Sequence, residues 1–279
     1  MWPRVGLLLG LGGAQGAIGW WMVKSGLEGG AWAQQRLETG HEVRVSPYRL
    51  ATHLSMAFAT YGLLLWTAMD VLRPMAVAVA DAKATPLRSL PALQLLRGSA
   101  LTSTALVAAT ALSGAFVAGN DAGNAYNTFP KMDGQWVPDG MWALTPFYRN
   151  LAETTATVQF DHRVLAMTSV VSVASTAALS LVPAVRSALP ALAARCVGAS
   201  GLLVVGQASL GVATLLNYVP IGLAASHQLG SLALLSVCGV GLHAMRFVPI
   251  AARAAAKRQG GLEAIMMREA KKAASKAPL

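Results

Sequence analysis

Two histidines lie inside long apolar stretches and belong to a residue type that binds metals. His162 lies in Gln159-Phe160-Asp161-His162-Arg163, at the head of one apolar run, and His227 lies near the start of the last run. An ionisable residue inside a membrane span indicates a functional site. Two imidazoles that face each other across a helical bundle can hold haem iron as its axial ligands. The pair therefore predicts a bis-histidine haem site.

A third histidine extends this pattern. His53, His162 and His227 each fall one or two turns inside the same end of their apolar runs, whereas His243 lies at the opposite end and His41 in a loop. For each histidine taken singly, a hydrogen-bonded structural role is the alternative. Three imidazoles at one depth favour iron ligands for the set.

Charged residues flank two of these histidines. Arg163 follows His162 directly, and Arg49 precedes His53 by one helical turn. A guanidinium in that place is predicted to pair with a haem propionate; the alternative is an arginine that snorkels to the membrane interface. Asp161 is expected either to orient an imidazole or to be an acid at a helix N-terminus.

The composition indicates an integral membrane protein. Of the 279 residues, 54% are hydrophobic and only 12% are charged, with mean hydropathy +0.50; soluble domains carry about 25% charged residues. The net charge of +10 is attributed to positively charged loops on one side of the membrane. No nucleic-acid motif is present, so no nucleic-acid partner is expected. Cys196 and Cys238 lie in apolar runs and are expected to be buried structural thiols.

Six uncharged runs are long enough to cross a bilayer as helices. The Met1 end, the loops near 70–97 and 183–195, and the C-terminal tail hold 15 of the 22 Lys and Arg residues and four of the 12 acids. That side is therefore predicted to face the cytoplasm or the mitochondrial matrix, and the opposite side is called outer here. The runs lie near 5–22, 50–69, 98–118, 164–185, 196–216 and 221–245.

An internal repeat suggests how the chain is divided. Gly13–Gly19 resembles Val205–Gly211, and in both segments a glutamine precedes a glycine by four residues, which places the two on one helix face. Each segment is followed by an outer loop and a helix with a histidine. Residues 98–250 are predicted to form a complete four-helix haem-binding bundle with an outer loop at 119–157. Residues 1–97 are predicted to form a partial pseudosymmetric half that lacks two helices, and residues 251–279 a basic tail.

The outer loop and the C-terminal tail lie outside the predicted spans, and the composition of each suggests a role. The outer loop is rich in aromatic residues, which are expected either to cap a haem pocket or to form an interfacial belt. The basic tail is expected to be a solvated helix or a disordered arm near anionic lipid.

Several motifs closely resemble the haem A synthase family, in its mitochondrial and alphaproteobacterial form. The resemblance covers most of the chain. It is carried by Leu112–Gly119, Asp121–Gly123, Tyr126–Met132, Gly19–Leu27, Tyr48–His53 and Gln159–Arg163.

This resemblance implies an enzyme that oxidises the C8 methyl group of haem O to the formyl group of haem A, for cytochrome c oxidase. It implies a bound haem b on His162 and His227, and His53 as a ligand of the substrate haem. It also implies haem O synthase and a ferredoxin electron donor as partners. The implied location is the mitochondrial inner membrane, with a bacterial plasma membrane as the alternative.

The sequence departs from the family pattern in one respect. The family's first two helices, with a Glu-x-x-His-Arg motif, have no counterpart, and Gln159 stands where that motif has its glutamate. A separate N-terminal chain or a homo-oligomer is expected to supply the missing ligand, unless the sequence is a truncated product. The alternative function is a non-catalytic haem-binding subunit or an assembly factor for cytochrome c oxidase. A transmembrane electron-transfer cytochrome is disfavoured because all three candidate ligands lie near one face.

Overall fold

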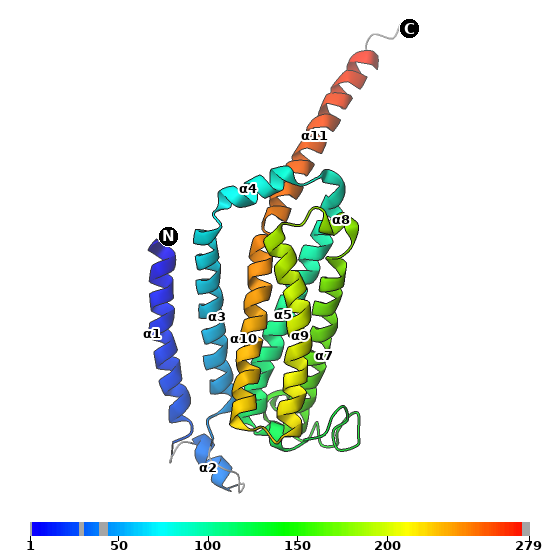
Figure 1. The fold of residues 1–279 in the computed structure, drawn as a ribbon. Helices are drawn as coiled ribbons and strands as arrows, with labels where there is room; N and C mark the ends of the chain where they lie inside the picture. Colours follow the sequence, from blue (N-terminus) through cyan, green and yellow to red (C-terminus); the bar gives the residue numbers. More distant parts are fainter. Residues whose placement is uncertain (1, 28–30, 39–43, 275–279) are drawn as a thin grey trace.

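The chain is an all-α membrane protein. A computed structural model describes residues 2–27, 31–38 and 44–274, in which every regular element is a helix and six helices are long and apolar enough to cross a membrane. Figure 1 shows these helices side by side, with the start of α1 and the protruding α11 at the same end. The six helices are α1 (Trp2–Lys24), α3 (Pro47–Leu72), α5 (Leu90–Gly119), α7 (Thr155–Leu179), α9 (Ala191–Leu216) and α10 (Ile221–Ala244).

Helices α5, α7, α9 and α10 form a four-helix bundle. Helices α7 and α10 each pack against both α5 and α9, so they lie on a diagonal of the bundle. One buried residue from each helix meets in the middle of the bundle, and a larger apolar cluster fills its inner end. The middle layer consists of Val107, Val173, Val204 and Leu234.

Hydroxyl pairs join α5 to α7 along the membrane. Ser99 Oγ lies 2.6 Å from Thr176 Oγ1, and Ser103 Oγ lies 2.8 Å from Ser172 Oγ. Nearer the outer side, Thr110 Oγ1 lies 2.9 Å from Ser169 Oγ. Hydroxyl hydrogen bonds and small side chains are typical of helix pairs in membranes, where lipid offers polar groups no partner. They fix the rotation of α7 against α5.

Helices α1 and α3 stand as a pair beside this bundle (Figure 1). Helix α1 packs on α3, and none of its residues is buried. Helix α3 also contacts α5 and α10, and the Tyr61 hydroxyl hydrogen-bonds Ser236 Oγ at 2.7 Å. The N-terminal pair is therefore attached to the bundle through α3.

A polar network ties the inner ends of three helices together. The Asp70 carboxylate on α3 accepts hydrogen bonds from Arg4 of α1 at 2.5 Å and from Arg246 at 3.1 Å, just after α10. His243 Nε2, on α10, lies 2.9 Å from the same carboxylate, and its ring meets Trp66 edge-on with centroids 4.9 Å apart. His243 therefore has a structural partner at the inner end, apart from the other histidines.

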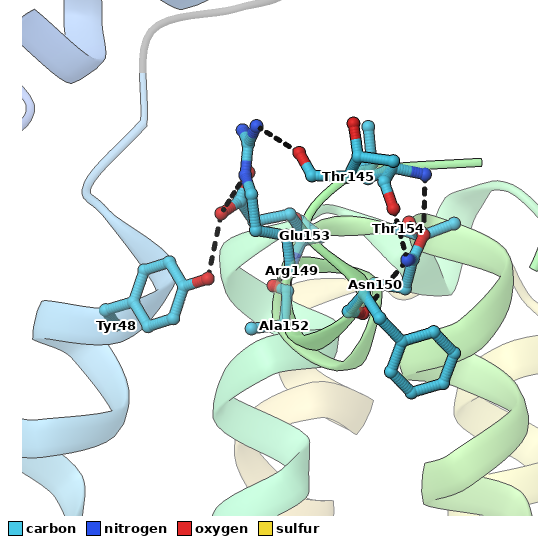
Figure 2. Close-up of polar contacts among 10 residues, drawn as sticks. Tyr48, Thr145, Arg149, Asn150, Ala152, Glu153 and Thr154 are labelled. Carbon is cyan, nitrogen blue, oxygen red and sulfur yellow. Dashed lines mark hydrogen bonds and ion pairs between the residues drawn. The ribbon is translucent and has the colours of Figure 1, made fainter. Parts of the chain in front are cut away.

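A second contact joins α3 to the bundle at the outer end. The Tyr48 hydroxyl donates to Glu153 Oε1 at 2.8 Å, and Arg149 Nη2 donates to Glu153 Oε2 at 2.6 Å. Figure 2 shows Tyr48 reaching from α3 to the short helix α6 (Asn150–Glu153), where this carboxylate lies. We call these three residues the outer clasp.

The observed helices differ from the expected spans most at α5, which begins at Leu90 rather than near 98, and at α7. The apolar run predicted a span at 164–185, but α7 begins at Thr155 and ends at Leu179. The prediction missed the first turns because they hold Gln159, Asp161, His162 and Arg163, which an apolar criterion excludes. Two of these side chains hydrogen-bond loop carbonyl oxygens, so the helix continues through them.

Further helices occupy segments that the sequence predicts to be loops or tail. Helix α2 (Ala31–Glu38) lies in the first outer connection, α4 (Met75–Ala84) in the inner loop after α3, and α8 (Pro183–Arg186) before α9. The basic tail begins in α11 (Phe247–Ala274), in agreement with the solvated helix rather than the disordered arm. Residues 275–279 and His41 lie outside the described residues.

The outer clasp predicts a pH dependence of stability. Burial alone raises the pKa of the Glu153 carboxyl, but hydrogen bonds from Arg149 and Tyr48 outweigh it and hold the pKa below its ordinary value of 4.5. A carboxyl whose pKa is lower in the folded than in the unfolded state stabilises the fold above the ordinary pKa. This contribution is lost as the pH falls through the folded pKa. We expect the unfolding temperature of the wild type to fall more steeply below about pH 4.5 than that of Glu153→Gln.

Thermal unfolding in detergent at a series of pH values checks this expectation. Tyr48→Phe removes one donor to the carboxylate and keeps Arg149. The fall of its unfolding temperature with pH should therefore be less steep than that of the wild type and steeper than that of Glu153→Gln. Parallel profiles for the wild type and Glu153→Gln would contradict the prediction.

Candidate functional site

The three candidate ligands lie at one depth. His53 is six residues into α3, His162 seven residues into α7 and His227 six residues into α10, and all three helices begin at the outer end. At a rise of 1.5 Å per residue, each imidazole is attached about 9–11 Å from its helix start. Each ring is half-buried.

His162 is held by a hydroxyl on α5. Ser113 Oγ lies 2.7 Å from His162 Nδ1, and the same hydroxyl donates to the Thr110 carbonyl oxygen at 2.7 Å. A serine hydroxyl has one hydrogen, so it accepts from Nδ1. Nδ1 therefore carries the ring proton, and the Nε2 lone pair is left free for a metal ion.

His227 is held by an amide and a glycine on α9. Gln207 Nε2 lies 3.1 Å from His227 Nδ1 and donates to the His227 carbonyl oxygen at 2.7 Å. A Cβ atom at Gly211 would lie 2.7 Å from His227 Cε1, so the ring occupies space that any other residue would fill. Gln207 and Gly211 are the glutamine and glycine of the sequence repeat.

His53 repeats this arrangement on the N-terminal pair. Gln15 Nε2, on α1, lies 3.2 Å from His53 Nδ1, 3.3 Å from His53 Nε2 and 3.2 Å from the His53 carbonyl oxygen. A Cβ atom at Gly19 would lie 3.0 Å from His53 Cε1. The repeat in sequence is therefore a repeat in space.

The structure places His162 and His227 on the diagonal helices α7 and α10 of one bundle, and His53 on another helix pair. His53 lies on α3, where its side chain contacts α1. Two neutral imidazoles facing each other within a bundle can serve as ligands to one metal ion. No group of three or more His, Cys, Asp or Glu residues suited to a metal occurs in the described chain.

Arg163 and Gln159 connect α7 to the outer loop. Arg163 Nη2 donates to the Tyr126 carbonyl oxygen at 3.0 Å and to Gln159 Oε1 at 3.2 Å. Gln159 Nε2 donates to the Ala122 carbonyl oxygen at 2.8 Å. Asp161 makes no hydrogen bond to an imidazole within the described residues. Both arginine and glutamine therefore position the loop above His162.

Arg49 has the corresponding place in the N-terminal pair. Its guanidinium donates to the Trp21 carbonyl oxygen at 2.8 Å and lies 4.5 Å from the centre of the Trp21 ring. Arg49 thus caps the outer end of α1 one turn before His53.

The sequence pattern alone does not identify the residues that hold the rings. Ser113 falls within a family motif, and Gln15 and Gln207 are members of the repeat. One sequence pattern could have predicted that the two glutamines contact the histidines. In both halves a glutamine stands four residues before a glycine, on the helix that precedes the helix with the histidine.

Comparison with known proteins decides the family. The family model described as cytochrome oxidase assembly protein, COX15-CtaA, matches residues 1–238. The chain belongs to this family. Its members named heme A synthase COX15 in Arabidopsis thaliana and Bos taurus are each 44% identical to it, over 86% and 88% of the chain. A protein named heme A synthase from Nitrosospira multiformis is 41% identical over 80% of the chain.

The chain spans about half the length of the curated relatives it matches. The matched segments make up 49%, 55% and 56% of the Arabidopsis, bovine and Nitrosospira proteins. No solved structure matches the chain. The relatives come from eukaryotes and bacteria, which fits a multi-pass protein of the mitochondrial inner membrane or a bacterial plasma membrane.

The close fit of His227 against Gly211 predicts an unequal response to two alanine substitutions in α9. Gly211→Ala forces the His227 ring to move, whereas Gly206→Ala enters open space because no atom lies within 4 Å. We expect Gly211→Ala to be less stable than Gly206→Ala by about 1–3 kcal/mol, the usual cost of overpacking. Unfolding of the two variants in the same detergent measures this difference. Equal stability would show that the ring moves aside without cost.

Proposed function

We propose that the chain is the haem-binding part of a haem A synthase, which oxidises the C8 methyl group of haem O to a formyl group to make haem A for cytochrome c oxidase. The observation that carries the proposal is the pair of histidines at one depth on the diagonal helices α7 and α10, in a chain of this family. The proposal assigns a resident haem b to His162 and His227. It assigns haem O, the substrate, to His53.

The residues around the pair suit a haem in three respects. The donor set consists of two imidazoles, which are common axial ligands of haem iron. Gly211 and Gly114 present no side chain to the rings: a Cβ atom at these positions would lie 2.7 and 3.5 Å from the respective Cε1 atoms. Gln207 Oε1 is buried without a hydrogen-bond partner, so an acceptor beside His227 is still available.

Each residue then has a defined task. His162 and His227 bind through Nε2, Ser113 keeps the His162 proton on Nδ1, and the apolar layer below them excludes water from the inner side. Arg163 lies at the outer surface, where its charge suits a propionate. When bound, haem b supplies a one-electron redox centre between an electron donor and the substrate.

The N-terminal pair is proposed to present the substrate. His53 is held by Gln15, and Arg49 one turn away offers a guanidinium at the outer surface. Among the described residues no second histidine faces His53, so the opposite ligand is proposed to come from another polypeptide or a second copy of the chain. Haem O synthase is the proposed source of the substrate and a ferredoxin the proposed electron donor.

The second candidate function is a non-catalytic haem-binding subunit or assembly factor for cytochrome c oxidase. The observation that favours it is the lone His53 on the substrate side. The two candidates share the haem on His162 and His227. They differ in whether haem O is converted.

Haem content and conversion test the proposal together. We expect the purified wild-type chain to show a six-coordinate haem b in a reduced-minus-oxidised spectrum, and His162→Ala and His227→Ala each to lose it. His53→Ala is the matched control, because it removes an imidazole at the same depth and should keep the haem b spectrum. A wild-type chain without haem, or with haem retained in both variants, would refute the proposal.

An assay of haem O conversion separates the two functions. Membranes that contain the chain are supplied with haem O and a reducing system, and chromatography then detects any haem A formed. Formation of haem A that is lost in His53→Ala supports the synthase. A full haem b spectrum with no haem A formed supports the non-catalytic role.

A further inference from the structure

The two glutamines of the repeat contact their histidines in the same way. In each half the amide nitrogen donates to the carbonyl oxygen of the histidine, at 3.2 Å for Gln15 and 2.7 Å for Gln207. In each half it also lies beside the ring, 3.2 Å from His53 Nδ1 and 3.1 Å from His227 Nδ1. The two helix pairs, α1 with α3 and α9 with α10, thus share one geometry of the glutamine–histidine contact although their connecting loops differ.

In this geometry the contact with the histidine carbonyl oxygen determines the direction of each amide. A carbonyl oxygen accepts hydrogen bonds only, so the amide atom that contacts it must be the nitrogen. The other amide atom, Oε1, is buried without a partner both in Gln15 and in Gln207. A buried acceptor with no donor costs free energy. Each half therefore has a buried acceptor one amide rotation away from its histidine ring.

The Gln207 side chain is held in place by a glycine on the opposite helix. A Cβ atom at Gly230 would clash with Gln207 Oε1, just as one at Gly211 would clash with the His227 ring. The histidine of α10 thus fits against a glycine of α9, and the glutamine of α9 against a glycine of α10. This reciprocal fit keeps Oε1 within one turn of His227.

An iron-bound histidine needs the acceptor that Gln207 holds. A histidine that binds iron through Nε2 carries its proton on Nδ1 and donates it to a neighbouring acceptor, which orients the ring and raises its basicity. His162 has such an acceptor in Ser113 Oγ. At His227 the nearest polar group is the amide nitrogen, and two donors would then face each other. Rotation of the amide, which exchanges its hydrogen bond to the His227 carbonyl oxygen for one from Nδ1–H to Oε1, removes this conflict.

We propose that Gln207 is a positioning residue for the iron ligand His227, and Gln15 its counterpart for His53, each accepting the Nδ1 proton through Oε1. This inference rests on the proposed function. Gln15 lies almost equally far from both ring nitrogens of His53, so its contact selects neither tautomer.

Three variants of the full chain in detergent test the role of Gln207. Gln207→Leu keeps the shape and removes the acceptor, and we expect it to bind haem about 10- to 100-fold more weakly. Loss of the acceptor weakens the binding of ferric haem more than that of ferrous haem. If the two losses of affinity differ tenfold, the midpoint potential rises by about 59 mV. Gln207→Glu keeps an acceptor and should restore tight binding with a potential at or below that of the wild type. Gly230→Ala displaces Oε1 without touching the ring and should shift the potential as Gln207→Leu does.

Gln15→Leu is the matched control, because it makes the same change on α1 and should leave the haem b potential and its ferric electron paramagnetic resonance spectrum as in the wild type. The inference is overturned if Gln207→Leu keeps the wild-type potential and spectrum, or if Gln207→Glu behaves like Gln207→Leu. A wild-type chain that binds no haem refutes the proposed function instead, and the inference falls with it.

Discussion

A polar side chain within the hydrocarbon region must find its hydrogen-bond partner within the protein, because lipid offers none, and the partners that lie on a neighbouring helix join the two helices. In this chain such pairs occur at three depths: Asp70 with Arg4, His243 and Arg246 at the inner end, the hydroxyl pairs of α5 and α7 in the middle, and the glutamine–histidine and serine–histidine pairs nearer the outer end. Apolar contacts between helices are weakly selective in lipid, whose tails are equally apolar. The polar pairs therefore select which helix faces meet.

The sequence predicted the six spans and the common depth of three histidines, since both follow from where apolar runs begin. It did not predict the start of α7 at Thr155, because the partners of Gln159 and Arg163 are carbonyl oxygens of a loop whose path no pattern encodes. Nor did it predict that Ser113 holds His162, since that contact depends on the rotation of α5 against α7. Whether the histidines bind haem stays a prediction.

The repeat is detectable in the sequence because the two halves share their helix faces, although their loops differ. Gln207 precedes its histidine by 20 residues and Gln15 by 38, so the loops between them differ greatly in length. The local geometry is nevertheless shared, because glutamine and glycine four residues apart present one face to the next helix. The helix faces, rather than the connections, determine how the rings are seated. Gly230 has no counterpart one turn after His53, where Met56 stands, so only one half has the reciprocal glycine fit.

The inner network also sets an order of events during synthesis. Asp70 meets Arg4 across 66 residues, but His243 and Arg246 follow it by 173 and 176 residues. At a translation rate of about 5–20 residues per second, Asp70 is made roughly 9–35 seconds before its later partners. Over that interval Arg4 is the one of these three partners that has already been made. The ion pair therefore favours the association of α1 with α3 before α10 is complete.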